Sequence, residues 1–215
     1  NIMYLLVKKI IERGYGEKLN MWAYSRIDTV RDQKQLELIR KAGIKWLCLG
    51  IESGEKKIRL EVTKGKFEDL DIREVVEKVH DADIEIIANY LFGLPGDTFE
   101  SMQKTLDLSI ELCTIAWNAY AVMALPGSGL YKKAIEKGFE LPDDYDYTGY
   151  SFHSYNTQPL PTDNLSPAEI LKFRDEAFTK YHTSPNFLKK IQKKYGNVPI
   201  KNIEDMTKIK LKRKI

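Results

Sequence analysis

Short apolar runs that end in polar or glycine-rich turns recur along the chain and set its predicted organisation. The run at 46–51 contains no charged residue and is followed directly by Glu52, Ser53 and Gly54. A run this short, without polar alternation, predicts a strand buried on both faces, as in a parallel sheet. Three further runs predict strands: 21–30, 84–92 and 116–125.

Between these runs the apolar residues follow a helical period. Ile72, Val75, Val76 and Val79 occupy positions i, i+3, i+4 and i+7 of one predicted helix. Asp97 with Glu100 is interpreted as a capping box that opens another. Lys- and Glu-rich residues 54–71 are expected to form a loop. The remaining predicted helices lie at 2–13, 32–42 and 129–138, from 166 onward, and at 186–195 and 203–212.

Strand and helix alternate four times, at intervals long enough for a βα crossover. This is the pattern of a parallel (β/α) barrel or of a doubly wound sheet, and the sequence does not distinguish between them. After Gly138 the pattern stops, and residues 140–163, rich in Tyr, Asp, Pro and Ser, predict an ordered loop. Its expected anchors are aromatic: Tyr145, Tyr147, Tyr150, Phe152 and Tyr155. Ser166 and Glu169 then form a capping box. We therefore divide the chain into a barrel portion, 1–139, and a C-terminal loop and helical extension, 140–215.

Composition narrows the class of protein only modestly. The 215 residues, 43% of them hydrophobic and 30% charged, suit one sizeable globular domain with at most a small appendage. A net charge of +3 makes nucleic acid an unlikely partner. No apolar run approaches the roughly 20 residues of a membrane span. The two cysteines, Cys48 and Cys113, give no disulfide framework, so we expect a reducing cytoplasm. The start without Met, inside a helical pattern, predicts a fragment.

The residues that could carry chemistry lie where strands end. Glu52 and Ser53 follow a buried strand, at the edge of the sheet where parallel α/β proteins bind ligands. A cap or a surface ion pair is the alternative role for Glu52. The turn Gly93-Leu94-Pro95-Gly96-Asp97 follows the next strand and opens on the same edge. It is neither a Walker loop nor a dinucleotide fingerprint.

Other candidate groups carry little signal. His80 is expected to be solvated, and His153 and His182 are isolated beside aromatic residues. Neither cysteine has a partner at the spacing of metal ligands. The basic stretch 201–213 is interpreted as a solvated helix face. The candidate site therefore contains no predicted catalytic residue and no predicted metal ligand.

Four motifs, in order, resemble the radical S-adenosylmethionine (SAM) superfamily. They are Arg26-Ile27-Asp28, Leu49-Gly50-Ile51-Glu52-Ser53-Gly54, Phe92-Gly93-Leu94-Pro95-Gly96-Asp97-Thr98 and Ala124-Leu125-Pro126-Gly127-Ser128-Gly129-Leu130-Tyr131. The nearest branch is the cobalamin-binding group that includes oxidative cyclases of the magnesium-protoporphyrin ester type and methyltransferases. Residues 160–167 and the helix after them resemble the extension that follows the barrel in that group.

The resemblance implies an α/β fold, a portion of a (β/α)6 partial TIM-type barrel, that holds SAM at the C-terminal ends of its strands. It places Glu52, with Ser53 and Gly54 shaping its turn, beside the ribose or amino-acid moiety of SAM. It places Arg26 near the SAM carboxylate or the substrate. The adenine would be bordered by Asn89, Tyr90, Gly93 and the backbone at Leu125.

The departure from the family is the cluster motif. The superfamily binds a [4Fe–4S] cluster through three cysteines spaced C-x3-C-x2-C, which these residues lack. The resemblance therefore implies that the cluster loop and any cobalamin domain belong to the missing N-terminal part of the same protein. The intact enzyme would modify a small-molecule substrate by oxidative cyclisation or methyl transfer, and this chain alone would be inactive.

Two rival interpretations remain open. One is a barrel enzyme in which Glu52, Arg26 and Asp28 perform ordinary acid–base chemistry. The other is a cluster-free barrel that binds a nucleotide-like ligand as a binding module. In a truncated barrel the first predicted strand, at 21–30, is expected to leave an open sheet edge that would invite pairing of two copies of the chain into a homodimer.

Overall fold

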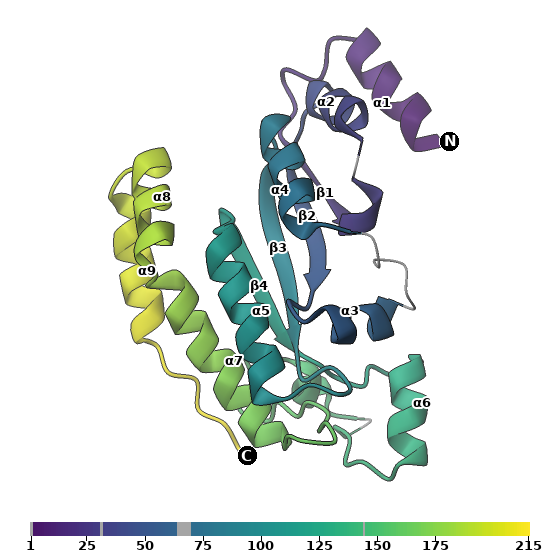
Figure 1. Cartoon of the computed structure of the whole chain (residues 1–215), viewed down its shortest axis with the longest axis vertical. Coiled ribbons are helices and arrows are strands. Elements are labelled where there is room, and N and C mark those ends of the chain that lie inside the picture. The colour runs from purple at the N-terminus through teal and green to yellow at the C-terminus, as the bar shows by residue number, and fades with distance from the viewer. Residues whose placement is uncertain (1, 31, 64–69, 144) are drawn as a thin grey trace.

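The computed structural model describes residues 2–30, 32–63, 70–143 and 145–215 (Figure 1). Its four strands are β1 (Met21–Arg26), β2 (Ile44–Glu52), β3 (Glu85–Phe92) and β4 (Ala116–Ala121). The helices along the barrel portion are α1 (Ile2–Glu12), α2 (Gln33–Lys41), α3 (Lys56–Thr63), α4 (Ile72–Asp81), α5 (Phe99–Leu112) and α6 (Gly129–Glu136). The C-terminal helices are α7 (Pro167–His182), α8 (Pro185–Tyr195) and α9 (Val198–Lys208).

The strands form one parallel sheet in the order β1-β2-β3-β4. Because each strand is added beside the previous one, the strand order never reverses, as it would in a doubly wound sheet. α2, α4, α5 and α7 pack on the sheet or on one another, and their apolar residues share one core cluster with it. The strand order is therefore that of a (β/α) barrel, and the sheet is open, which confirms the predicted fold class.

Side-chain alternation along the strands explains why one face of the sheet packs against the helices and the other does not. In β3 the residues Ile86, Ala88, Tyr90 and Phe92 are fully buried, whereas those between them are half-buried. Successive side chains of a strand point to opposite faces, so the buried set meets the helices and the other set forms the inner face. Ile170 and Tyr181 of α7 belong to the same core cluster as the sheet. The division between 1–139 and 140–215 stays a prediction.

Helix caps confirm some of the predicted boundaries and correct one. The Ser166 hydroxyl accepts from the Glu169 backbone N–H, and the Glu169 carboxylate accepts from the Ser166 backbone N–H, as the capping box requires. α5, however, is capped by Thr98 with Ser101, not by Asp97 with Glu100. The Asp97 carboxylate is buried and accepts from Leu94 N–H at 2.8 Å and from the Ser101 hydroxyl at 2.6 Å. Asp97 thus fixes the turn to α5 rather than capping it.

Two segment predictions are wrong in part. The segment 54–71 is not all loop, because α3 covers 56–63; residues 64–69 of that segment lie outside the described residues. The strand predicted at 21–30 stops at Arg26 and continues as a 3-10 helix at Ile27–Thr29. The buried side chain of Ile27 belongs to the core, so the turn keeps the apolar character that suggested a longer strand.

Several side chains also differ from expectation. His80 is half-buried on α4, and its pKa is lowered by burial and by nearby Lys190 and Lys194, so it is not a solvated residue. In the loop after α6, Tyr145, Tyr147 and Tyr155 are exposed and do not anchor it. Of the predicted anchors, Phe152 does contact the sheet: its ring packs edge-on against Tyr120, with 5.1 Å between the ring centroids. The loop is also held by its backbone, since Leu160 N–H donates to the Val122 carbonyl at 2.9 Å.

The basic stretch 201–213 is not a continuous solvated helix face. α9 ends at Lys208, and residues 209–215 run back along α7 toward its N-terminus (Figure 1). There Arg213, whose side chain is only 10% exposed, forms an ion pair with Asp175 of α7. α7 also reaches the outer strand of the sheet, because Arg174 Nε donates to the Ala119 carbonyl of β4 at 2.9 Å.

Candidate functional site

The inner face of the sheet carries a hollow near the C-terminal ends of the strands, mainly apolar in its lining and with a few polar side chains. Its volume is about 440 Å³, and residues of all four strands line it: Tyr24, Ser25, Arg26, Cys48, Gly50, Glu52, Asn89, Leu91 and Tyr120. One row of residues crosses the sheet at this level, because Arg26 is paired with Gly50, Gly50 with Asn89, and Asn89 with Asn118. Strand register therefore brings together residues that are far apart in the sequence.

Glu52 is placed by an irregular end of β2. The register between β2 and β3 shifts between Gly50 and Glu52, and Glu52 adopts a left-handed backbone conformation with φ of 68°. A Cβ atom on Gly50 would overlap the Glu52 Oε1 atom, so the carboxylate folds back over the strand into space that only glycine leaves. Non-glycine residues at positive φ are uncommon and cluster at functional sites.

Burial raises the pKa of the Glu52 carboxyl, and the opposing charge of Arg26 partly offsets this effect. The Arg26 guanidinium itself forms a forked contact with Asp28, with Nε–Oδ1 of 3.1 Å and Nη2–Oδ2 of 2.7 Å. The site thus presents one desolvated carboxylate beside a paired guanidinium. Asp28, which the acid–base interpretation needs as a proton carrier, is engaged by Arg26.

Asn89 lines the hollow and is oriented by its neighbours. Its Nδ2 donates to the Leu49 and Ile87 carbonyls at 3.4 and 3.3 Å, and its Oδ1 accepts from Asn118 Nδ2 at 3.0 Å. Asn118 was not among the predicted site residues. The only sequence signal for it is a polar residue inside an apolar strand, and its importance follows from register with Asn89.

The other predicted site residues do not point into the hollow. Ser53 is fully buried, and its hydroxyl lies 3.2 Å from the Thr105 hydroxyl of α5. Gly54 lies against the same helix, where an added Cβ would be 2.5 Å from the Lys104 carbonyl oxygen. Both residues therefore anchor the turn after β2 to α5.

Tyr90, Gly93 and Leu125 lie in three different places, all of them outside the lining of the hollow. Tyr90 is fully buried in the helix-covered core, and its hydroxyl has no hydrogen-bond partner among the described residues. Gly93, with φ of 80°, packs under Ile170 of α7, which a Cβ atom would meet at 2.8 Å. Leu125 is 55% exposed beyond the end of β4. The hollow thus unites Arg26, Glu52 and Asn89 from the predicted set.

The sequence profile described as the Radical SAM superfamily matches residues 3–109, which confirms the predicted resemblance. This segment contains Arg26, Glu52 and Asn89, the three predicted residues of the hollow.

The chain is also similar in sequence to curated proteins, among them a cyclase and a methyltransferase. The anaerobic magnesium-protoporphyrin IX monomethyl ester cyclase of Cereibacter sphaeroides is 24% identical over 165 residues, covering 76% of this chain and 26% of the relative. The tryptophan 2-C-methyltransferase of Streptomyces laurentii is 27% identical over 129 residues, covering 55% of this chain and 21% of the relative.

The chain therefore spans about a quarter of the length of the curated relatives it matches. Among solved structures, it is similar to the radical S-adenosylmethionine methyltransferase TsrM from Kitasatospora setae, determined with cobalamin and a [4Fe–4S] cluster bound. The TM-score is 0.54 at 21% identity, and the match covers 62% of this chain and 26% of that chain. At this identity the likeness concerns the fold, which agrees with the open barrel-like sheet described above.

A radical SAM domain implies SAM and a [4Fe–4S] cluster, and the described residues suit these two groups unequally. The described ranges contain no group of three or more His, Cys, Asp or Glu side chains that could hold a metal ion. Cys48 is buried in β2 and Cys113 precedes β4, so the two thiols do not form a cluster site. The hollow, by contrast, offers a carboxylate, a guanidinium and an amide, which match the hydroxyl, ammonium and carboxylate groups of SAM. In the same described ranges, no helix has the length and hydrophobicity to cross a bilayer.

Proposed function

We propose, from the radical SAM match of residues 3–109, that this chain supplies the SAM pocket and part of the substrate wall of a larger radical SAM enzyme. One observation carries the proposal: Arg26, Glu52 and Asn89 line one hollow at the strand ends, although they come from three different strands. Polar groups gathered at the C-terminal ends of parallel strands are the usual ligand site of barrel-like folds.

Each residue of the hollow has a role that suits its chemistry. The Glu52 carboxylate would accept hydrogen bonds from the ribose hydroxyls or the ammonium group of SAM, and its desolvation strengthens such contacts. Arg26 would pair with the SAM carboxylate or with substrate. Asn89, held by Asn118, would border the adenine.

The residues that point away from the hollow would act through position. Ser53 and Gly54 hold the turn after β2 against α5, which fixes where Glu52 emerges. The Tyr90 ring packs near the Trp117 ring in the core, with 6.4 Å between the ring centroids. This contact would fix the position of β3. Their substitution is therefore expected to disturb SAM binding indirectly.

In the intact enzyme, SAM would support radical-based modification of a small molecule, either oxidative cyclisation or methyl transfer with cobalamin. The cluster ligands and any cobalamin domain would lie outside this chain, because its described residues do not suit a cluster. The residues of this chain would bind and orient SAM and shield it from water. By itself the chain would be inactive.

The test is made on the longest polypeptide that the gene encodes, purified without oxygen and reconstituted with iron and sulfide. We expect about four irons per chain and formation of 5′-deoxyadenosine when SAM and a reductant are added. SAM binding without iron would instead favour the cluster-free binding module. Turnover in the absence of iron would favour ordinary acid–base chemistry at Glu52.

A further inference from the structure

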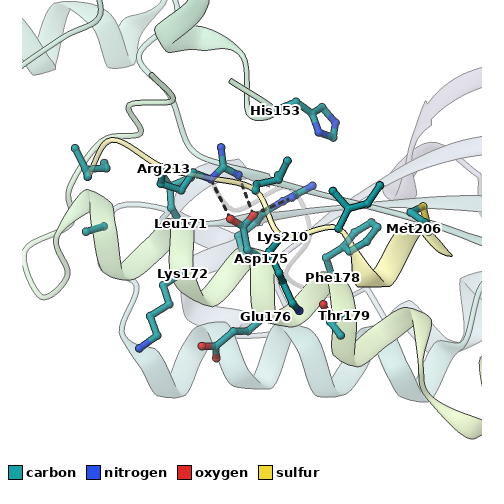
Figure 2. A pocket seen from close by; sticks show the side chains of 15 residues that line it. His153, Leu171, Lys172, Asp175, Glu176, Phe178, Thr179, Met206, Lys210 and Arg213 are labelled. Atoms are coloured by element: carbon teal, nitrogen blue, oxygen red, sulfur yellow. Dashed lines mark hydrogen bonds and ion pairs between the residues drawn. The ribbon is translucent and has the colours of Figure 1, made fainter. Parts of the chain in front are cut away.

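A groove of about 460 Å³ lies between α7 and the C-terminal segment 209–215, away from the hollow of the sheet. Its lining is mainly apolar, with Leu171 and Phe178 from α7, Met206 from α9, and Ile209 and Leu211 from the segment. Figure 2 shows Phe178 and Met206 together toward one end of the groove. A cavity of this size and character is that of a small-molecule site.

The walls of the groove are held in place by Arg213. Its guanidinium donates to Asp175 through Nε at 3.0 Å and Nη2 at 2.9 Å, and Figure 2 shows the two side chains facing each other. Its Nη1 donates to the Ser154 carbonyl at 3.0 Å and to the Thr157 hydroxyl at 2.8 Å. The C-terminal segment, the loop before α7 and α7 itself are thus joined at one residue, which preforms the groove.

The charged end of the groove carries more positive than negative charge. Arg174 is 95% buried, since its exposed fraction is 5%, and it lines the groove. Its Nε donates to Ala119 and its Nη1 to Asp175, but Nη2 has no hydrogen-bond acceptor among the described residues. Two guanidinium groups, Arg174 and Arg213, therefore share the single carboxylate of Asp175.

The surroundings give Arg174 no further anion. Its guanidinium lies over the rings of Phe152 and Phe178, at 5.3 and 5.6 Å from the centroids. His153, also in the lining, is exposed but partly desolvated there, and its pKa is lowered by this desolvation and by the charges of Arg174 and Arg213. Figure 2 shows Lys172 and Glu176 pointing away from the Arg213–Asp175 pair, with His153 on its opposite side.

We propose that this groove binds an amphipathic carboxylate, an acid with one carboxyl group and an apolar body. The carboxylate would accept from Arg174 Nη2 beside His153 and balance the second guanidinium, while the apolar body would lie against Leu171, Phe178 and Met206. A neutral apolar ligand would leave the excess charge unpaired, and a small anion would leave the apolar wall exposed. The proposal is independent of the SAM pocket and of any cluster.

The test uses the 215-residue chain with its methionine methyl groups labelled with ¹³C. Met206 lines the groove and the other methionines do not, so its methyl resonance reports binding at this place. We expect octanoate to shift the Met206 resonance saturably. Octan-1-ol should bind at least about tenfold more weakly and acetate should leave the resonance unchanged. Equal binding of octanol, or saturable octanoate binding that leaves Met206 unshifted, would overturn the proposal, as would no octanoate binding.

Two variants test the charged end. His153 is exposed, so His153→Glu should fold normally while placing a carboxylate where the ligand's would lie, and we expect octanoate affinity to fall about tenfold. Tyr145→Glu adds the same charge to the same loop at a residue that is 97% exposed and outside the groove lining, and it should bind octanoate as the parent does. Unchanged affinity in His153→Glu, or an equal loss in both variants, would contradict the proposed position of the carboxylate.

Discussion

Gly50 decides where the carboxylate of Glu52 lies. Because Gly50 has no Cβ, the Glu52 side chain can fold back over β2 into the hollow, where burial raises the pKa of its carboxyl. The atom that a Cβ would displace is the end of a flexible side chain and not backbone. A change at Gly50 should therefore alter the site while leaving the fold nearly intact.

Gly50→Ala is expected to weaken SAM binding about tenfold while the free energy of unfolding changes by less than about 1 kcal/mol. Equilibrium dialysis against labelled SAM, on the reconstituted enzyme, measures the first quantity and urea unfolding the second. Gly129→Ala is the matched control, since a Cβ there meets nothing within 4 Å. Equal SAM affinity in the Gly50 variant and the parent would remove Glu52 from the proposed site.

The buried His182 is expected to make the free energy of unfolding depend on pH. The ring is buried among aromatic residues and its Nδ1 lies 2.8 Å from the Phe178 carbonyl. Burial lowers its pKa below the unfolded value, despite the opposing hydrogen bond to Phe178. The unfolded chain thus binds the proton more readily, and stability is lost as the pH falls through about 6.5, the unfolded pKa, toward the lower folded value.

We expect the free energy of unfolding to fall between about pH 7.5 and pH 5 in the parent, and to fall less in His182→Phe, which places an aromatic ring at the same position that cannot titrate. Urea unfolding at both pH values measures the difference. His153→Phe serves as the control, because His153 is largely exposed and should change the pH dependence less. An identical pH dependence in parent and His182→Phe would show that His182 does not contribute.

Among the secondary-structure elements, α7 connects the sheet to everything that follows it. Its N-terminus has a complete capping box at Ser166, whereas the N-cap of α8, Ser184, makes no side-chain cap hydrogen bond. Two serines at equivalent positions therefore differ in the contact they make, and this difference isolates the value of the cap.

Ser166→Ala is expected to lower the free energy of unfolding by about 1 kcal/mol, because a helix N–H loses its acceptor. Ser184→Ala should have little effect, since no cap hydrogen bond is lost there. Urea denaturation of both variants makes the comparison. A loss in Ser184→Ala as large as in Ser166→Ala would mean that the capping hydrogen bond is not what stabilises α7.

The elements themselves could be predicted well where local pattern decides them. The apolar stripe of Ile72–Asp81 and the buried strand of Ile44–Glu52 follow from periodicity alone. α3 was missed because its sequence is rich in Lys and Glu and lies between turns. The spacing of Asp97 and Glu100 predicts a cap because it cannot show that the Asp97 carboxylate turns back to Leu94.

The site was predictable only as far as it is local. Glu52 follows directly from its place after a buried strand, but Asn118 enters through register with Asn89, a contact 29 residues apart. The cluster of Arg174, Asp175 and Arg213 depends on a segment folding back over 38 residues. No periodic pattern in the sequence predicts such long-range contacts.

At the scale of the whole molecule, apolar side chains remain on the surface near the N-terminal edge. Met3, Tyr4, Leu5 and Leu6 of α1 are each about half exposed, with values from 47% to 62%. Trp22 and Tyr24 belong to β1, an outer strand of the sheet, and are 57% and 75% exposed. Their rings pack edge to face, with 5.0 Å between the ring centroids. An outer strand flanked by apolar side chains favours pairing with another chain.

We expect this chain, studied alone, to self-associate in a concentration-dependent manner, in keeping with the predicted homodimer. Light scattering across a dilution series measures it. A Leu5→Glu, Tyr24→Lys double substitution should shift the chain toward monomer, whereas Ile135→Glu, at an exposed residue of α6, should not. A parent chain that stays monomeric at every concentration would contradict the prediction.

The contact between Arg174 and the outer strand β4 also bears on how the chain emerges from a ribosome. Ala119 is synthesised 55 residues before the arginine that covers its carbonyl. At about 5–20 residues per second, that edge of the nascent sheet waits roughly 3 to 11 seconds for its cover. Synonymous codons that slow translation between β4 and α7 would lengthen this interval, so yield of folded protein should depend on codon choice there more than in the segment after α7.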